Sequence, residues 1–155
     1  MKSPAVPALA LVLAGVWRLA AADAPRPSGA RLWTRASLQS LNRTLARSGA
    51  PYAQVIKAKT YGVLLLRRTV SGSPELHAKL NDFFVVLSGT AQVRVGGVVT
   101  GEMTVAPDEE RGERLTGGTL YRVEQGDVLF VPASHWLQVL IPKGQVLRAL
   151  IIKTQ

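Results

Sequence analysis

The sequence has no cysteine among its 155 residues and only two histidines, His77 and His135. Without cysteine, the chain can form no disulfide, no thiolate metal site and no cysteine nucleophile. The G-x-S-x-G, P-loop, H-E-x-x-H and dinucleotide-binding motifs are also missing. Any hydrolytic triad would have to use one of the two histidines, and neither lies in a recognisable nucleophile context. These absences exclude several common enzyme classes.

Acidic residues are few, and the basic residues are not clustered. Nineteen lysines and arginines stand against ten acids, giving a formal net charge of +9. The longest basic run is the pair Arg67-Arg68, and no alternation of aromatic and basic residues indicates a stacking surface for bases. The charge therefore predicts weak attraction to anionic partners and no nucleic-acid partner.

No apolar run is long enough to span a bilayer. Residues 1–24 have an early lysine, an apolar run of about 13 residues at 5–17, and small residues that permit cleavage after Ala22 or Ala24. A membrane-spanning helix needs ~20 apolar residues. We therefore predict a signal peptide over 1–24 and an exported protein, periplasmic or secreted, with no stable membrane span after cleavage. An uncleaved anchor is the alternative, because Arg18 lies close to the cleavage region.

A short leader and one helix are predicted next. Residues 25–33 contain "PRPSG", which is typical of a flexible segment. Over residues 34–49 we expect an amphipathic helix that packs on a sheet, begun by Thr34 or Ser37 and ended by Gly49. Its apolar face has three leucines at helical spacing: Leu38, Leu41 and Leu45.

From residue 52 to residue 155 the pattern changes to short runs of valine, leucine, isoleucine and aromatics. Examples are "YGVLLLRRTV", "DFFVVLSG" and "VLRALIIK", separated by glycine, proline, serine and asparagine. This pattern is typical of an all-β sandwich or closed barrel. The glycine-rich, acidic stretch 96–118 is predicted to be a long loop or hairpin, either a solvated excursion or the rim of a pocket.

Two segments resemble the sequence motifs of cupins. "ELHAKLNDFFVVLSGTAQVRVGG" is similar to the first motif, G-x5-H-x-H-x3,4-E-x6-G, and "EQGDVLFVPASHWLQVL" to the second, G-x5-P-x-G-x2-H-x3-N. The resemblance covers residues 55–153 and is strongest to small, exported, single-domain bacterial cupins. It implies a cupin-type jelly-roll β-barrel over 52–155, preceded by the amphipathic helix.

The first motif implies a metal-ligand set. Asp82 and Gly89 match the E-x6-G half, and counting back from Asp82 places His77 and Glu75 at the two histidine positions. Glu75 and His77 would share one face of a strand, and a turn would bring Asp82 alongside on the neighbouring strand. One imidazole and two carboxylates suit a divalent ion such as Mn, Fe, Ni or Zn. Lys79 opposes this, because its ammonium on the same face would repel a cation or pair with Asp82.

The second motif is incomplete. Gly126, Pro132 and Ser134 fit it, but Leu137 stands where cupins have their last metal-binding histidine. His135 lies two positions earlier, on the same face as Leu137 if the strand extends that far, and about 6.6 Å from the ligand position at ~3.3 Å per residue. We expect Leu137 to be a core residue.

The site residues allow three functions. We favour a module that binds a small polar or anionic ligand inside the barrel, through His77, Lys79, His135 and Trp136, with weak or no metal binding. The alternative is a divalent-metal-dependent enzyme of oxygenase or isomerase type that uses Glu75, His77 and Asp82. A second alternative is a structural barrel without a ligand.

The state of assembly is also predicted. Cupins commonly pair through their outer strands, so the resemblance predicts a homodimer. We expect its interface on the runs "VLLLRR" or "VLRALIIK", which can equally be buried core strands.

Overall fold

The computed structural model describes residues 29–155. The chain divides into a short N-terminal unit, Met1–Leu32, and a second unit, Trp33–Gln155, which holds the helix and the strands. The predicted signal peptide and most of the predicted leader lie outside the described residues. Within the part that is described, no helix has both the length and the apolar character that crossing a membrane requires.

The helix forms where the leucine spacing indicates it. Helix α1 (Arg35–Ser48) begins at Thr34, whose side chain accepts a hydrogen bond of 3.1 Å from the backbone N–H of Ser37. It ends at Gly49, which has a positive φ of 72° and donates its N–H to the carbonyl of Leu45. Leu45 is buried, and α1 packs against the first two strands. Helix α1 therefore covers part of a sheet.

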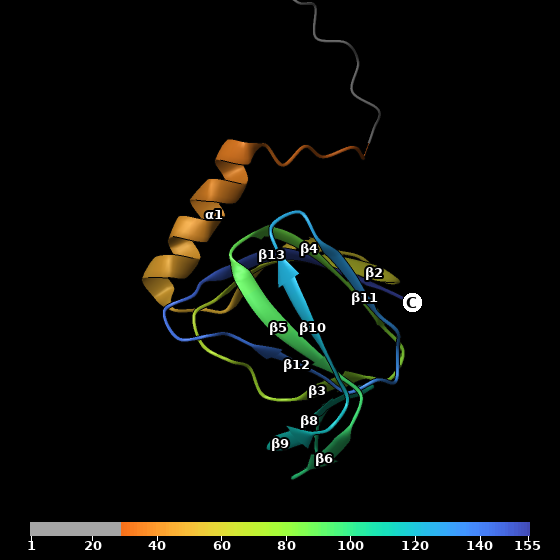
Figure 1. Ribbon diagram of the computed structural model, residues 1–155. Helices are drawn as coiled ribbons and strands as arrows, with labels where there is room; N and C mark the ends of the chain where they lie inside the picture. Colours follow the sequence, from red (N-terminus) through yellow and green to blue (C-terminus); the bar gives the residue numbers. More distant parts are fainter. Residues whose placement is uncertain (1–28) are drawn as a thin grey trace, which may run out of the picture. The chain divides into compact units, whose positions relative to one another are not determined.

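Three antiparallel groups of strands make up the rest of the described unit (Figure 1). One sheet has the order β1-β2-β13-β4-β11, the other β10-β5-β12-β3-β8-β7, and β6 pairs with β9. The bounds are β1 (Tyr52–Lys57), β2 (Tyr61–Arg68), β3 (Glu75–His77), β4 (Asn81–Ser88), β5 (Thr90–Val95), β6 (Val98–Thr100), β7 (Met103–Ala106), β8 (Glu109–Arg111), β9 (Arg114–Thr116), β10 (Thr119–Glu124), β11 (Val128–Val131), β12 (Leu137–Leu140) and β13 (Leu147–Thr154).

The last strand lies in the middle of the first sheet. β13 pairs with β2 on one side and with β4 on the other, so residues far apart in the sequence become neighbours. Its buried residues alternate as Leu147, Ala149 and Ile151, and this inward face continues to Lys153. The register sets Lys153 directly opposite Asp82 of β4. The pairing therefore brings a lysine from the end of the chain into the barrel beside a carboxylate from the first motif.

A hydrophobic core lies between the two sheets. Leu137 belongs to it with 1% of its surface exposed, which confirms the prediction that this residue is core. Phe84 is also in the core, whereas Phe83 packs on the outside against Phe130 at a ring-centroid distance of 4.8 Å. The prediction of an all-β barrel with one N-terminal helix is confirmed.

A glycine of the first motif is required by its surroundings. Gly89 joins β4 to β5 with a positive φ of 83°. A Cβ atom there would collide with the backbone carbonyl of Val146. The turn therefore needs glycine for both its conformation and the space it leaves.

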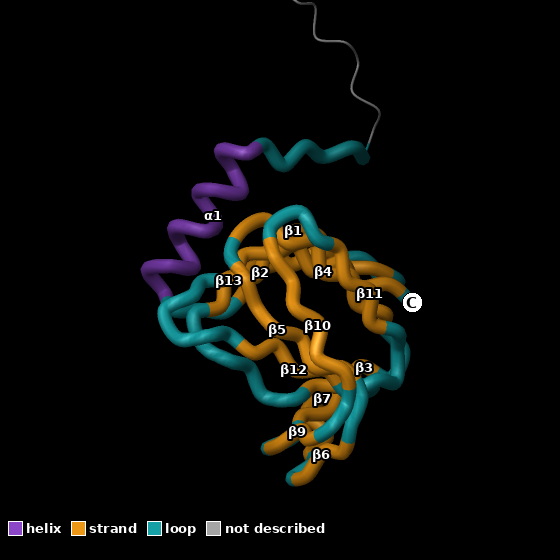
Figure 2. The backbone as a smooth tube through the Cα atoms, in the orientation of Figure 1, coloured by secondary structure: helices purple, strands orange, loops and turns teal. Residues whose placement is uncertain are grey.

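The structure decides between the alternatives for two parts of the sequence. The stretch 96–118 is the predicted hairpin and not a long loop, because it forms four short strands in which β7 pairs with β8 and β6 with β9. Strands β6, β7 and β9 lie together at one end of the barrel in Figure 2. The runs "VLLLRR" and "VLRALIIK" follow the second of their two predicted alternatives, buried core strands and not an edge, since β2 and β13 are interior strands of their sheet. The edge strands of the two larger sheets are β1, β11, β10 and β7.

Candidate functional site

The barrel contains a cavity of about 530 Å³ that is open to solvent. This volume lies within the range of small-molecule binding sites, ~300–1,000 Å³. Side chains from both sheets line it, with strands β1, β2, β4 and β13 on one side and β3, β8 and β12 on the other. Its apolar lining comes from the hydrophobic core: Leu64, Leu66, Phe84, Val139 and Ile151.

A lysine, a histidine and an aspartate meet at one end of this cavity. Lys153 Nζ lies 2.6 Å from His77 Nε2 and 2.7 Å from Asp82 Oδ1. His77 and Asp82 are buried, with 6% and 2% of their surfaces exposed. Backbone pairing sets this geometry, because Asp82 and Lys153 are opposite each other across β4 and β13. The ammonium donates to both acceptors.

Burial fixes the protonation of the histidine. Removal from water, together with the positive charges of Lys153 and Arg111, lowers the pKa of His77 to about 3. The imidazole is therefore neutral at physiological pH, and its Nε2 is free to accept a hydrogen bond from Lys153. His77 Nε2 is also 3.6 Å from Asp82 Oδ2, but a neutral ring forms no salt bridge there.

The aspartate is subject to opposing effects. Burial raises the pKa of Asp82, while the charge of Lys153 and its hydrogen bond act to lower it. The net direction is upward. The 2.7 Å contact with Lys153 compensates the buried carboxylate and keeps the two groups together as an ion pair.

A second ion-pair group adjoins the first. Arg111 NH1 lies 2.9 Å from Glu75 Oε2, and Arg111 NH2 lies 2.5 Å from Glu109 Oε1. The contact to Glu75 is an ion pair without hydrogen-bond geometry, because Arg111 NH1 makes no hydrogen bond within the described residues. Strands β3 and β8 position both groups, since Glu75 is opposite Arg111 and His77 is opposite Glu109. Glu75 is thereby neutralised by an arginine.

The structure brings the three predicted metal ligands together, although the strands that carry them are arranged differently from the prediction. Glu75 and His77 share the inward face of β3, and Glu75 Oε2 is 3.9 Å from His77 Nε2. Asp82 was expected on a neighbouring strand, but β3 and β4 belong to different sheets. Asp82 therefore faces His77 across the interior of the barrel.

Lys79 does not take the place expected of it. Strand β3 ends at His77, so the alternation of faces does not continue to Lys79. Its side chain is 67% exposed, and its Nζ lies 3.1 Å from Asp108 Oδ2 at the cavity mouth. The ammonium that pairs with Asp82 is that of Lys153.

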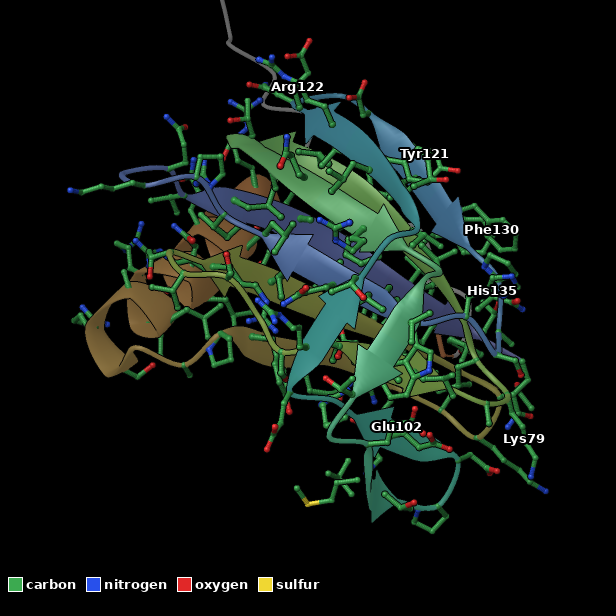
Figure 3. All side chains as sticks on the ribbon, turned by 60° about the horizontal axis from the view of Figure 1, so that its bottom comes forward. Lys79, Glu102, Tyr121, Arg122, Phe130 and His135 are labelled. Atoms are coloured by element: carbon green, nitrogen blue, oxygen red, sulfur yellow. The ribbon has the colours of Figure 1, made fainter. Side chains whose placement is uncertain are left out.

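His135 and Trp136 lie outside the cavity lining. Strand β12 begins only at Leu137, so the alternation that would turn His135 inward is absent. His135 is exposed, its Nδ1 is 2.9 Å from the carbonyl oxygen of Ala133, and Figure 3 shows it on the outside of the barrel. The preceding residue, Ser134, has a positive φ of 60° and donates its N–H to the carbonyl of His77. This turn directs the His135 side chain outward.

Two basic residues of the site were missed from the sequence. Lys153 continues the inward alternation of "VLRALIIK", and this pattern could have identified it. Arg111 lies in the stretch predicted to be a long loop or hairpin, and its strand has only three residues, too few to show an alternating pattern. Which partners these residues meet depends on strand pairing over long sequence separations.

Comparisons with known proteins identify the fold. No protein-family model matches the chain, and no curated protein does. Among solved structures, the Cnp3 cupin domain of Schizosaccharomyces pombe matches with a TM-score of 0.51 and 12% identity, over 67% of this chain and 63% of that one. A double-stranded β-helix protein from Klebsiella pneumoniae matches with 0.55 and 11%, over 81% and 90%.

A protein from Bacillus halodurans matches with a TM-score of 0.57 and 19% identity, over 82% of this chain and 83% of that one. The chain thus spans less than two thirds of the Cnp3 domain structure and most of the two bacterial ones. These likenesses confirm the predicted fold, a small cupin, or double-stranded β-helix, jelly-roll barrel.

The side chains present do not fit the divalent metal that the cupin resemblance implies. Lys153 Nζ already contacts the donor atoms of His77 and Asp82, and Arg111 neutralises Glu75. Leu137 supplies no donor in the remaining position. Over residues 29–155, no group of three or more histidine and acidic side chains is arranged to hold a metal ion.

Proposed function

We propose that this protein is an exported binding protein whose barrel cavity holds a small polar or anionic ligand. The observation that carries the proposal is the charge of the cavity lining. Six basic side chains line the cavity against four carboxylates. Each of the four carboxylates, Glu75, Asp82, Asp108 and Glu109, is in an ion pair. The net charge of these cavity-lining side chains is therefore positive.

Arg68 is the basic residue best placed to bind an anion. Within the described residues it forms no ion pair, and its Nε atom is buried without a hydrogen-bond partner. Its guanidinium lies close to Gly72, where a Cβ atom would come within 2.9 Å of it. The charge of its guanidinium is therefore not compensated by a described carboxylate, and a ligand carboxylate can accept hydrogen bonds from two guanidinium N–H groups at once. Lys57 and Lys59, on the same lining, add to the positive charge.

The two polar ends of the cavity are far apart. Gly62 is opposite Lys153 on β2, and Arg68 is six residues further along that strand, or ~20 Å at ~3.3 Å per residue. Apolar side chains line the part between them. A ligand suited to this lining has an apolar body, a carboxylate at Arg68, and an oxygen acceptor or carbonyl towards Lys153.

The other two functions considered from the sequence are less well supported. A structural barrel packed shut needs no cavity of about 530 Å³. A metal-dependent enzyme needs an ion where Lys153 already contacts two of the three expected ligands. Export, to the periplasm or the exterior, is part of the proposal and rests on the signal-peptide pattern of residues 1–24.

Calorimetry with matched probes tests the proposal. We expect hexanoate and decanoate to bind and the corresponding neutral amides to bind at least ten times more weakly, because only the acids offer a charged acceptor to Arg68. Arg68→Gln should weaken carboxylate binding by about 10- to 100-fold. Arg122→Gln, on the exposed strand β10 in Figure 3, is the matched control and should leave binding unchanged. Carboxylates that bind no better than amides would contradict the proposal.

A further inference from the structure

We infer that the ammonium of Lys153 is the permanent cation of this cavity and stands in place of a divalent metal ion. An oxygen of the ligand then binds to the ammonium instead of to a metal. The part concerning the ligand rests on the proposed function, whereas the exclusion of metal stands on the geometry of Lys153, His77 and Asp82 alone.

The contacts of Lys153 exclude a metal ion from this position. A metal at this site would have to bind the Nε2 atom of His77 and a carboxylate oxygen of Asp82, at ~2.0–2.2 Å from each. Both atoms are within 2.7 Å of Lys153 Nζ, so a metal and the ammonium cannot occupy the same space. The two contacts use two of the three N–H donors of the ammonium. The third donor remains for an acceptor.

The charges around Lys153 also disfavour a divalent ion. The 2.6 Å contact between Lys153 Nζ and His77 Nε2 is one that an incoming ion would need to break, and the single charge of Asp82 is matched by that of Lys153. Glu75, the third expected ligand, is turned to Arg111 at 2.9 Å. A divalent ion would meet two positive side chains and no uncompensated carboxylate. The side chains already present therefore balance the charges of the carboxylates without a metal ion.

The position of Lys153 in the fold makes the cation permanent. Its backbone lies in β13, hydrogen-bonded between β2 and β4, and not in a mobile loop. Its side chain is only 20% exposed and crosses the cavity end towards His77. Unlike a bound ion, it cannot be removed by a chelator. An ammonium also provides donors with one charge and no open coordination position, which suits binding a carbonyl or carboxylate oxygen.

Removing the lysine should therefore uncover a metal site. The test uses the full mature domain without a histidine tag, in a His135→Gln background that leaves His77 as the one histidine. Titration calorimetry with Zn²⁺ compares this parent with Lys153→Ala and Lys153→Met. We expect both variants to bind one equivalent at least tenfold more tightly than the parent, because Asp82 and His77 lose their partner. Adding His77→Ala should abolish the gain.

A control and the contrary outcomes complete the test. Lys143→Ala removes an exposed ammonium that does not line the cavity and should leave Zn²⁺ binding at the parental level. Stoichiometric Zn²⁺ binding by the parent, or no gain in either Lys153 variant, would overturn the inference. Using two variants guards against one that fails to fold, and the parental titration needs neither. If the parent excludes Zn²⁺, the variants gain it, and no carboxylate binds, the proposed function fails while the assignment of Lys153 stands.

Discussion

Lys153 and Asp82 lie directly opposite each other on neighbouring antiparallel strands, and their side chains form an ion pair of 2.7 Å inside the barrel. One residue comes from the first cupin-like motif and the other from the third-last position of the chain. The pair therefore joins two distant regions of the sequence at one end of the cavity.

Removing the lysine should destabilise the protein more than removing the pair. Lys153→Met leaves the buried carboxylate of Asp82 without a partner, which we expect to reduce the free energy of unfolding by ~3–5 kcal/mol. The double variant Lys153→Met with Asp82→Asn carries no charge there and should recover part of this loss. Urea unfolding of the parent and the variants measures the coupling. Additive losses would contradict a direct interaction.

Stability should fall in acid because of His77. Its pKa is lowered to about 3 in the folded protein from 6.5, so the unfolded chain binds the additional proton between these values. The stabilisation is complete above pH 6.5 and is lost as the pH falls towards 3, by up to ~1.4 kcal/mol per pH unit. The raised pKa of Asp82 offsets part of this loss, since its protonation favours the folded state. Urea unfolding between pH 7.5 and 4 measures the slope.

Glutamine variants of the two histidines test whether His77 causes the pH dependence. His77→Gln should flatten the acid-side slope, although the variant begins from a lower stability. His135→Gln should leave the slope intact, because this side chain is exposed. Equal slopes in all three proteins would show that His77 is not the group responsible.

Two motif glycines should respond differently to alanine. Gly89 and Gly126 both have positive φ values, 83° and 95°. A Cβ at Gly89 meets the backbone of Val146, whereas a Cβ at Gly126 meets nothing within 4 Å. Gly126→Ala should therefore cost ~1–2 kcal/mol of backbone strain, and Gly89→Ala should cost considerably more or prevent folding. Thermal unfolding followed by circular dichroism compares them, and equal costs would contradict the predicted collision.

The homodimer stays a prediction, and the structure suggests where to test it. The edge strand β11 exposes Val128 and Phe130, with 63% and 50% of their surfaces accessible, and Phe130 packs on Phe83. If two copies pair through this surface, Phe130→Lys should shift the sedimentation coefficient from dimer to monomer without unfolding the barrel. A parent that sediments as a monomer at high concentration would refute the dimer.

The sequence predicts the fold well because the relevant signals are local. Leucine spacing locates α1 and its caps, and the motif glycines and valine-rich runs locate the barrel strands. The inward orientation of Glu75 and His77 follows from a spacing of two along one strand. These features depend on neighbouring residues and on strand geometry, which the sequence displays directly.

The composition of the site is less predictable because long-range pairing decides it. The sequence suggests Lys79, three residues away, as the ammonium beside Asp82, but that ammonium belongs to Lys153, 71 residues away. Lys79 and His135 lie just beyond the ends of β3 and β12, where alternation no longer holds. Arg111 is aligned with Glu75 by the register of two three-residue strands. Sequence pattern alone does not fix such registers.

Nitrogen NMR of the His77 imidazole in the unmodified protein tests the central claim most directly. At pH 7 we predict a neutral ring with Nε2 unprotonated, hydrogen-bonded to Lys153, and a Nε2 signal that does not move when one equivalent of Zn²⁺ is added. A Nε2 signal that shifts stoichiometrically on adding Zn²⁺ would show that a metal, and not the ammonium of Lys153, is the cation of this site.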